Sequence, residues 1–191
     1  FNSLELGTGW YPVVPIAMYL SGARNVVSID LNQLMQVEGL RETVQKYQDW
    51  LKAGKLERFS PFFTEKRKGQ LLQLKSETMG FNELCLALEL DYRVGDARKL
   101  EDPDETYDLI HSNNVFEHVY PEALEQILLE FKRVLKKPGM MSHFIDMSDH
   151  FAHLDSGITI YNFLRYSRAQ WSRIDNSVQP QNRWRLKDYE E

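Results

Sequence analysis

The sequence has almost no cysteine and no long hydrophobic run. Cys85 is the one cysteine among 191 residues, so neither a disulfide framework nor a zinc site built from cysteines can form within this chain. No apolar stretch approaches the roughly 20 residues that a membrane-spanning helix needs. We also see no cleavable signal segment at the start of the chain. These absences predict a cytoplasmic protein without a membrane partner.

Positive charge is scarce as well. The chain has 23 Lys and Arg residues against 28 Asp and Glu residues, which gives a net charge of −5. This balance does not favour a nucleic-acid partner. Hydrophobic residues make up 42% and charged residues 27% of the chain, as in a folded globular protein. The length predicts one domain over residues 1–191, and the oligomeric state is left open.

Short apolar strands alternate with segments of helical length. We expect strands at residues 2–6, 25–29, 92–94, 107–111 and 140–145. Among the helices, we expect residues 11–21, 37–51 and a long helix that begins near Pro121 and ends at Pro138-Gly139. This alternation is typical of βαβ units. It predicts the α/β class, with a doubly wound, mostly parallel sheet.

Two segments depart from the alternation. Residues 52–90 are longer than a usual connection, and we expect one or two helices there as an insertion or a lid. Residues 147–185 are polar and aromatic without a clear period, and we expect them to cover the substrate. The chain opens inside a strand and stops within an amphipathic helix that begins at Leu186. We therefore expect the domain to be truncated at both ends.

The first strand runs into a Gly-x-Gly turn formed by Gly7 and Gly9. Glycine has no Cβ and tolerates positive φ, so a ligand can approach the backbone closely. Asp30 ends the next strand, roughly 20 residues further on, where its carboxylate can accept both hydroxyls of a ribose. This order predicts a site for a nucleoside-bearing cofactor at the carboxyl ends of the strands.

A dinucleotide site would have a third glycine in this turn. Pro12 stands there instead, and we expect Trp10 and Tyr11 to crowd the space that a pyrophosphate needs. Glu5 adds negative charge, which disfavours a pyrophosphate and favours a cation. The chain also lacks a Tyr-x-x-x-Lys catalytic pair. An NAD(P)-dependent oxidoreductase and a non-catalytic binding domain of the same fold are the alternatives.

Five motifs in order resemble the class I S-adenosylmethionine-dependent methyltransferase family, in its type 11/12-like domain. Glu5, Gly7 and Gly9 match the acid-x-Gly-x-Gly motif, although Tyr11 stands where a further glycine is common. The other matches are Asp30, Gly95-Asp96-Ala97, Tyr107–Ile110 continuing to Asn113–His118, and Arg133–Gly139. The resemblance covers about residues 2–146, and the last two strands of the family are not in this chain.

The resemblance implies a Rossmann-like methyltransferase fold, S-adenosyl-L-methionine as cofactor, and methyl transfer to a small-molecule or glycan-like acceptor. It implies that Glu5 and the turn hold the amino acid end, that Asp30 binds the ribose and that Asp96 binds the adenine. The full set of expected cofactor-binding residues is Glu5, Gly7, Thr8, Gly9, Asp30, Leu31, Asp96, Ala97 and Asn113. The fourth strand lacks the Asn/Asp-Pro-Pro-Tyr pattern of enzymes that methylate nucleic acids or amides. The sequence does not identify the acceptor atom.

Further chemistry follows the fifth strand, in residues 146–155. This stretch contains three acids and two histidines, of which His150 or His153 could act as a general base near neutral pH. The same group could bind a divalent metal or form an ordinary solvated loop, and we assign no metal ligand. We expect substrate contacts from His118, Asn182 and Arg183. The nearby aromatic residues are better explained as a small satellite core.

Overall fold

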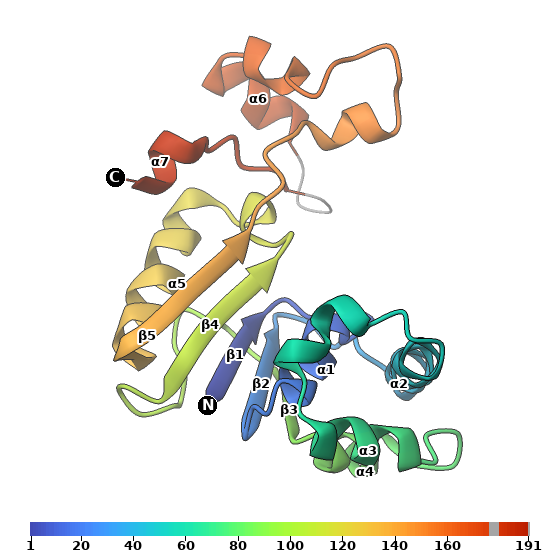
Figure 1. The fold of residues 1–191 in the computed structure, drawn as a ribbon. Coiled ribbons are helices and arrows are strands. Elements are labelled where there is room, and N and C mark those ends of the chain that lie inside the picture. Colours follow the sequence, from blue (N-terminus) through green and yellow to red (C-terminus); the bar gives the residue numbers. More distant parts are fainter. Residues whose placement is uncertain (176–179, 191) are drawn as a thin grey trace.

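The computed structural model describes residues 1–175 and 180–190 (Figure 1). Its centre is a five-stranded sheet of order β3-β2-β1-β4-β5 in which every neighbouring pair is parallel. The strands are β1 (Asn2–Leu6), β2 (Asn25–Asp30), β3 (Leu90–Val94), β4 (Tyr107–Asn113) and β5 (Leu135–Phe144). The strand order reverses between β1 and β4, which is where ligands bind in open α/β sheets. The expected doubly wound parallel sheet is confirmed.

Helices cover both faces of this sheet. The α-helices are α1 (Val13–Leu20), α2 (Val37–Lys52), α3 (Glu65–Gln73), α4 (Phe81–Ala87), α5 (Pro121–Val134), α6 (Arg168–Ile174) and α7 (Leu186–Glu190). Short 3-10 helices are η1 (Glu57–Phe62), η2 (Phe116–His118), η3 (His150–His153) and η4 (Asn162–Arg165). Successive strand residues face opposite sides. Val26 therefore joins the core with α1, α2 and α4, whereas Val27 joins the core with α5.

Helix α5 forms because its apolar residues recur at steps of three and four. Leu124, Ile127, Phe131 and Val134 are buried on one side of the helix. Pro121 occupies the first turn, where its missing N–H leaves no hydrogen bond unmade. The stripe packs against the sheet and places the C-terminal end of α5 beside the loop that follows β3.

The expected end of α5 at Pro138-Gly139 was wrong. The helix ends at Val134, and β5 begins at Leu135. Leu135 pairs with Tyr107, but the next pair joins Met140 to Leu109, so the intervening residues of β5 form an irregularity in the ladder. Pro138 has no N–H to give to the ladder, which explains why the strand is interrupted there.

Residues 52–90 contain η1, α3 and α4, in agreement with the expected helices. Leu71 and Leu84 are fully buried in the core shared with α1 and α2. Cys85 lies in the same core, and burial raises the pKa of its thiol to about 11. The amide of Thr64 donates to the carbonyl of Leu20 at 2.8 Å. These contacts make the segment a structural layer over one face of the sheet.

The segment after β5 lies beyond the carboxyl ends of β4 and β5 (Figure 1). Phe163 and Trp171 are buried there, with their rings edge to face at 5.9 Å, as a satellite core predicts. The Trp171 indole N–H donates to the carbonyl of Gln181 at 3.1 Å. Residues 176–179 of this segment lie outside the described residues. Among the helices that are described, none has the length and apolar character needed to cross a membrane.

Candidate functional site

The Gly-x-Gly turn lies at the carboxyl end of β1. Gly7 and Gly9 have φ values of +74° and +69°, in the left-handed region that favours glycine. A Cβ on Gly7 would lie 2.5 Å from Cγ2 of Val115, which belongs to the segment after β4. The Gly7 amide donates to the carbonyl of Ile29 at 2.9 Å. The turn is therefore packed tightly between the ends of β2 and β4.

Asp30 lies at the tip of β2 and faces this turn. Both of its carboxylate oxygens accept hydrogen bonds from the Gly9 amide, at 3.3 and 3.2 Å. The side chain is buried, and burial raises the pKa of its carboxyl group. The second-strand acid thus contacts the turn directly, and its expected contact with a ribose stays a prediction.

Glu5 lies beneath the turn. One of its oxygens accepts hydrogen bonds from Thr8 Oγ1 at 2.7 Å and from Ser28 Oγ at 3.4 Å. Its other oxygen lies 3.8 Å from Nδ1 of His111. Burial raises the pKa of Glu5 to about 7 and lowers the pKa of His111 to about 4. Glu5 therefore supports the turn from within the protein, and its expected contact with a cofactor stays a prediction.

A cavity of about 470 Å³ lies beside the turn. Five expected cofactor residues line it: Gly7, Asp30, Leu31, Asp96 and Ala97. Most of the remaining wall is apolar and includes Leu6, Ile29, Leu34, Val115, Val119 and Ile127. The other expected residues, Glu5, Thr8, Gly9 and Asn113, lie outside this lining. The wall thus combines apolar surface with two carboxylates, which suits a flat heterocycle with attached hydroxyl and amino groups.

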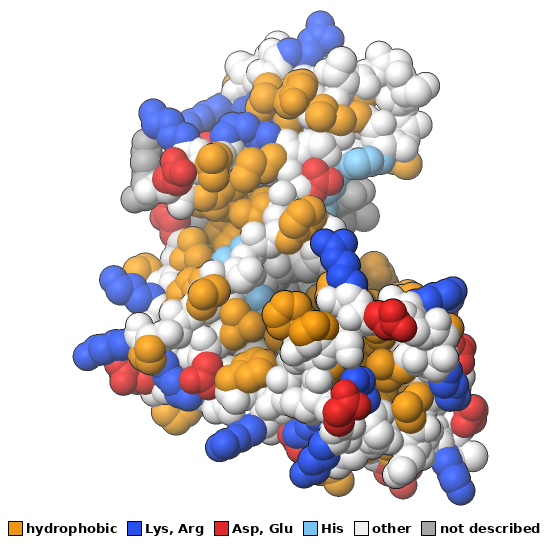
Figure 2. Space-filling view, viewed as in Figure 1, with side chains coloured by type: hydrophobic (Ala, Val, Ile, Leu, Met, Phe, Trp, Pro, Cys, Tyr) orange, Lys and Arg blue, Asp and Glu red, His pale blue; other side chains and the backbone are white. Residues whose placement is uncertain are grey.

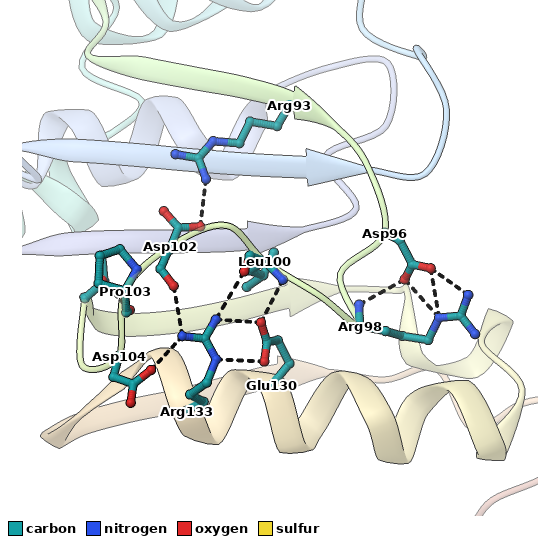
Figure 3. A network of polar contacts seen from close by, with 10 residues as sticks. Arg93, Asp96, Arg98, Leu100, Asp102, Pro103, Asp104, Glu130 and Arg133 are labelled. Atoms are coloured by element: carbon teal, nitrogen blue, oxygen red, sulfur yellow. Dashed lines mark hydrogen bonds and ion pairs between the residues drawn. The ribbon is translucent and has the colours of Figure 1, made fainter.

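The loop after β3 brings Asp96 and Ala97 to the cavity. Figure 3 shows Asp96 on this loop beside its partner Arg98. The carboxylate of Asp96 pairs with the Arg98 guanidinium, with a closest distance of 2.6 Å. This pair lowers the pKa of Asp96, so its carboxylate is ionised. The side chain of Ala97 is buried against the core. The loop therefore presents one charged and one apolar group side by side.

Arg133 of α5 holds the continuation of this loop (Figure 3). Its guanidinium donates to the carbonyls of Leu100 at 3.2 Å and Asp102 at 2.9 Å. It also pairs with Asp104 at 2.7 Å and with Glu130 at 2.6 Å. A planar guanidinium can serve several acceptors at once in a fixed geometry. Arg133 therefore fixes the path of the loop that forms one side of the cavity.

Trp10 and Tyr11 do not crowd the cavity as the sequence suggested. Their residues are 64% and 51% exposed, and neither lines the cavity. The core-facing residues of α1 begin at Pro15 and Ile16, so the chain just before the helix leaves its bulky side chains toward solvent. The steric argument against a pyrophosphate is therefore a wrong prediction. The argument from charge passes from Glu5, which lies outside the lining and has a raised pKa, to Asp30 and Asp96, which line the cavity.

The two expected catalytic histidines gather beside His118. The ring of His150 lies 4.8 Å from that of His118 and 5.6 Å from that of His153, between centroids. The Nε2 atoms of His150 and His153 each lie 3.5 Å from Asp146 Oδ2. His118 itself lines the cavity, and its expected contact with the substrate stays a prediction. The His150 ring is the neighbour of His118, and the His153 ring lies on the far side of His150.

Asn182 and Arg183 bind the backbone of the chain itself. The side-chain amide of Asn182 donates through Nδ2 to the carbonyls of Phe116 at 2.5 Å and Val119 at 2.7 Å. The Arg183 guanidinium donates to the carbonyl of Phe163 at 3.0 Å. Both side chains thereby fix the segment after β5, and their expected substrate role stays a prediction.

Sequence reasoning missed Glu117 and Val115 as neighbours of the site. Val115 lines the cavity, and Glu117 is 2% exposed at the base of the histidine group. Both belong to the Asn113–His118 stretch, but a buried glutamate among apolar residues gives no local signal of its own. Its partners come from segments about 30 or more residues away, such as the Asp146 amide.

Residues 68–142 match a family model described as a methyltransferase domain. A putative methyltransferase from Bacillus halodurans is 14% identical, with 98% of this chain and 58% of that chain covered and a TM-score of 0.49. The YcgJ protein from Bacillus subtilis is 16% identical, with 91% and 58% covered and a TM-score of 0.47. A protein from Pyrococcus horikoshii is 21% identical, with 73% and 46% covered and a TM-score of 0.41. This chain spans about half the length of these proteins.

The matching family model, the parallel sheet and the motifs along its carboxyl edge agree with one another. The match of residues 68–142 to a methyltransferase domain agrees with the resemblance that the sequence motifs indicate.

Proposed function

We propose that this chain transfers a methyl group from S-adenosylmethionine to a small-molecule or glycan-like acceptor. One observation carries the proposal: Gly7, Asp30 and Asp96 meet in one cavity at the carboxyl ends of β1, β2 and β3. When bound, S-adenosylmethionine supplies a methyl group on a sulfonium, which is already a good electrophile. The task of the protein is then mainly to bind and orient the reactants.

The residues of the cavity suit the adenosine part of this cofactor. Asp30 can accept hydrogen bonds from the ribose hydroxyls, and Asp96 can accept one from the adenine amino group. Ile29 and Val115 offer apolar surface to the heterocycle. Two carboxylates would repel a pyrophosphate, which supports a phosphate-free cofactor over NAD(P). We assign Glu5 and Thr8 to shaping the turn from below.

On the acceptor side, we assign the direct contact to His118. Its Nδ1 lies 2.9 Å from the carbonyl oxygen of Pro180, which can only accept a hydrogen bond, so Nδ1 is the donor and the lone pair of the neutral ring lies on Nε2. If His150 or His153 is the general base, the proton from the acceptor has to move through His118 to reach it. Burial lowers the pKa of His150, which supports a neutral ring at that position.

Calorimetric titration of the chain tests the cofactor. We expect one equivalent of S-adenosylhomocysteine to bind and NAD⁺ and NADH to give no heat of binding. In a thermal-shift assay, a ligand at about 100 times its Kd should add roughly 2.7 kcal/mol of stability. Binding of NADH without any response to S-adenosylhomocysteine would replace this proposal with the oxidoreductase alternative.

The proposed acceptor is a small molecule or a glycan rather than a nucleic acid. The net charge of −5 supports this, and Figure 2 shows acidic and basic side chains interspersed on the face in view. Methyl transfer from radiolabelled S-adenosylmethionine should label fractions of small metabolites or oligosaccharides and leave tRNA and DNA unlabelled. Label in the nucleic acids alone would overturn the acceptor class. The cytoplasmic location stays a prediction.

A further inference from the structure

Two groups of ligand-type side chains share His150. One contains Glu117, His118 and His150, and the other contains Asp146, His150 and His153. Within each group, one ligand atom per residue lies within 4.8 Å of the others. Each group therefore offers two imidazoles and one carboxylate. The first group joins η2 to the segment after β5, whereas the second lies wholly in the segment after β5.

The inner group contains buried polar atoms that lack partners. Glu117 is 2% exposed, and its Oε1 accepts a hydrogen bond from the Asp146 amide at 3.3 Å. Its Oε2 is buried without a hydrogen-bond partner within residues 1–175 and 180–190. The same holds for Nε2 of His150, whose contact with Asp146 Oδ2 is 3.5 Å long. Buried polar groups normally find a partner, so these two atoms point to one that is not part of the polypeptide.

The protonation pattern suits a metal ion. The Nδ1–H of His118 donates to the Pro180 carbonyl at 2.9 Å, which leaves Nε2 as the atom that can bind a metal ion. Histidine ligands of metals usually donate their other N–H to a carbonyl or a carboxylate in this way. The amide of Asp146 similarly fixes one oxygen of Glu117 and leaves the other available.

The outer group is more fully engaged within the protein. Oδ1 of Asp146 accepts a hydrogen bond from the Ser148 amide at 2.8 Å. Nε2 of His153 lies 3.3 Å from Ser148 Oγ, and the His153 side chain is 58% exposed. Asp146 and His153 can approach an ion held by the inner group, but their polar atoms already have partners within the protein.

We propose that Glu117, His118 and His150 bind one divalent first-row transition-metal ion, with Asp146 next to it. Mixed imidazole and carboxylate ligands suit ions such as Mn²⁺, Fe²⁺ or Zn²⁺, whereas Mg²⁺ and Ca²⁺ prefer oxygen ligands alone. The ion joins η2 to the segment after β5, and His118 places it beside the cavity. Metal binding uses the lone pair of His150 that the general-base hypothesis requires, so the two roles exclude each other. His118 is also the residue assigned to the acceptor, so the bound ion lies on the acceptor side of the proposed active site, whereas its binding requires no S-adenosylmethionine.

Titration of the metal-free, tag-free chain with ZnCl₂, and separately with MnCl₂, tests this site. We expect one equivalent of at least one of these ions to bind and to raise the Tm, and an equal concentration of MgCl₂ to have no effect. His150→Gln and Glu117→Gln should each weaken binding by at least about 10-fold. The control is Asp155→Asn, which changes an exposed carboxylate of the same segment and should bind like the unchanged chain.

Two further measurements keep the result clear. Circular dichroism and urea unfolding show whether each variant is folded. Histidine NMR compares the unchanged chain without and with the ion, so it does not depend on a variant. The saturating ion should shift the His118 and His150 signals and leave those of His111 and His143. Absence of saturable binding for both ions, or equal binding by folded His150→Gln and Glu117→Gln, would overturn the site. The titration contains no S-adenosylmethionine, so its failure leaves the proposed methyl transfer untouched.

Discussion

The carboxylate of Asp30 accepts hydrogen bonds from the amide of Gly9, at distances of 3.3 and 3.2 Å. The acid at the tip of β2 therefore also holds the turn that follows β1. Asp30 lines the cavity at the same time. One side chain thus shapes the backbone of the proposed cofactor site and offers its oxygens to the ligand.

Substitution of Asp30 should weaken binding of S-adenosylhomocysteine. Asp30→Ala removes both the contact with Gly9 and the acceptor for the ribose, and we expect a 10- to 100-fold higher Kd, or about 1.4 to 2.7 kcal/mol. Asp30→Asn keeps one acceptor oxygen and should lose less. The control is Asp91→Asn, at an exposed position of β3. Calorimetry checks the order of the three variants, and an unchanged Kd for Asp30→Ala would contradict the proposed site.

Gly7→Ala should destabilise the fold by about 1–3 kcal/mol, because the φ of +74° is strained for alanine and its Cβ meets Val115 at 2.5 Å. Gly9→Ala should cost less, since its Cβ meets nothing within 4 Å. Gly69→Ala is a matched control inside α3, with open space around the added Cβ, and it should stabilise slightly. Urea unfolding measures all three. Equal effects of Gly7→Ala and Gly69→Ala would rule out the close packing of the turn.

Stability should fall as the pH drops from 6.5 toward 4. Burial lowers the pKa of His143 to about 4, so the unfolded chain binds a proton in this range that the folded chain does not. Stability from this group is complete above pH 6.5, and between pH 6.5 and 5 it should lose at most about 2 kcal/mol. His111 acts in the same direction. Glu5 acts in the opposite direction, because its pKa is raised to about 7.

His143→Gln isolates one share of this pH dependence. We expect the slope of the unfolding free energy against pH to be smaller in the variant, whatever its absolute stability. Urea unfolding at pH 7, 6 and 5 measures both slopes. Parallel curves for the variant and the unchanged chain would show that His143 titrates normally in the folded state.

Arg133→Lys should loosen the loop between β3 and β4. Lysine keeps the charge but cannot reach the carbonyls of Leu100 and Asp102 together with Asp104 and Glu130, because it lacks the planar fork. We expect a lower free energy of unfolding in urea than for the unchanged chain. Hydrogen exchange should become faster in residues 96–104.

The matched control is Arg98→Lys, which affects an exposed pair with Asp96. Surface ion pairs contribute little, so this variant should leave the stability nearly unchanged. If both lysine variants behave alike, the network around Arg133 does not control the loop.

The sequence predicts the parts of this fold that depend on local patterns. The spacing of Leu124, Ile127 and Phe131 is enough to identify α5, and the order of short apolar segments is enough to predict a parallel sheet. Gly7, Gly9 and Asp30 are close to strand ends in the sequence. Parallel strands bring those ends to one edge, so their meeting could also be predicted.

Other features depend on contacts between distant segments. The Pro138-Gly139 pair is a normal stop signal for a helix, but pairing of Leu135 with Tyr107 starts the strand earlier. The directions of Trp10 and Tyr11 depend on which face of α1 meets the core. Glu117 lies far from its partners in the sequence, and only packing of the segment after β5 brings them together. No local pattern contains that information.

The reactivity of Cys85 reports local opening of the folded structure at one position. The thiol is packed in the core beside α1 and α2, and its raised pKa keeps it protonated at neutral pH. Thiolates, rather than thiols, react with alkylating reagents. Alkylation of Cys85 therefore requires the structure around α4 to open, and the alkylation rate measures how often this local opening occurs.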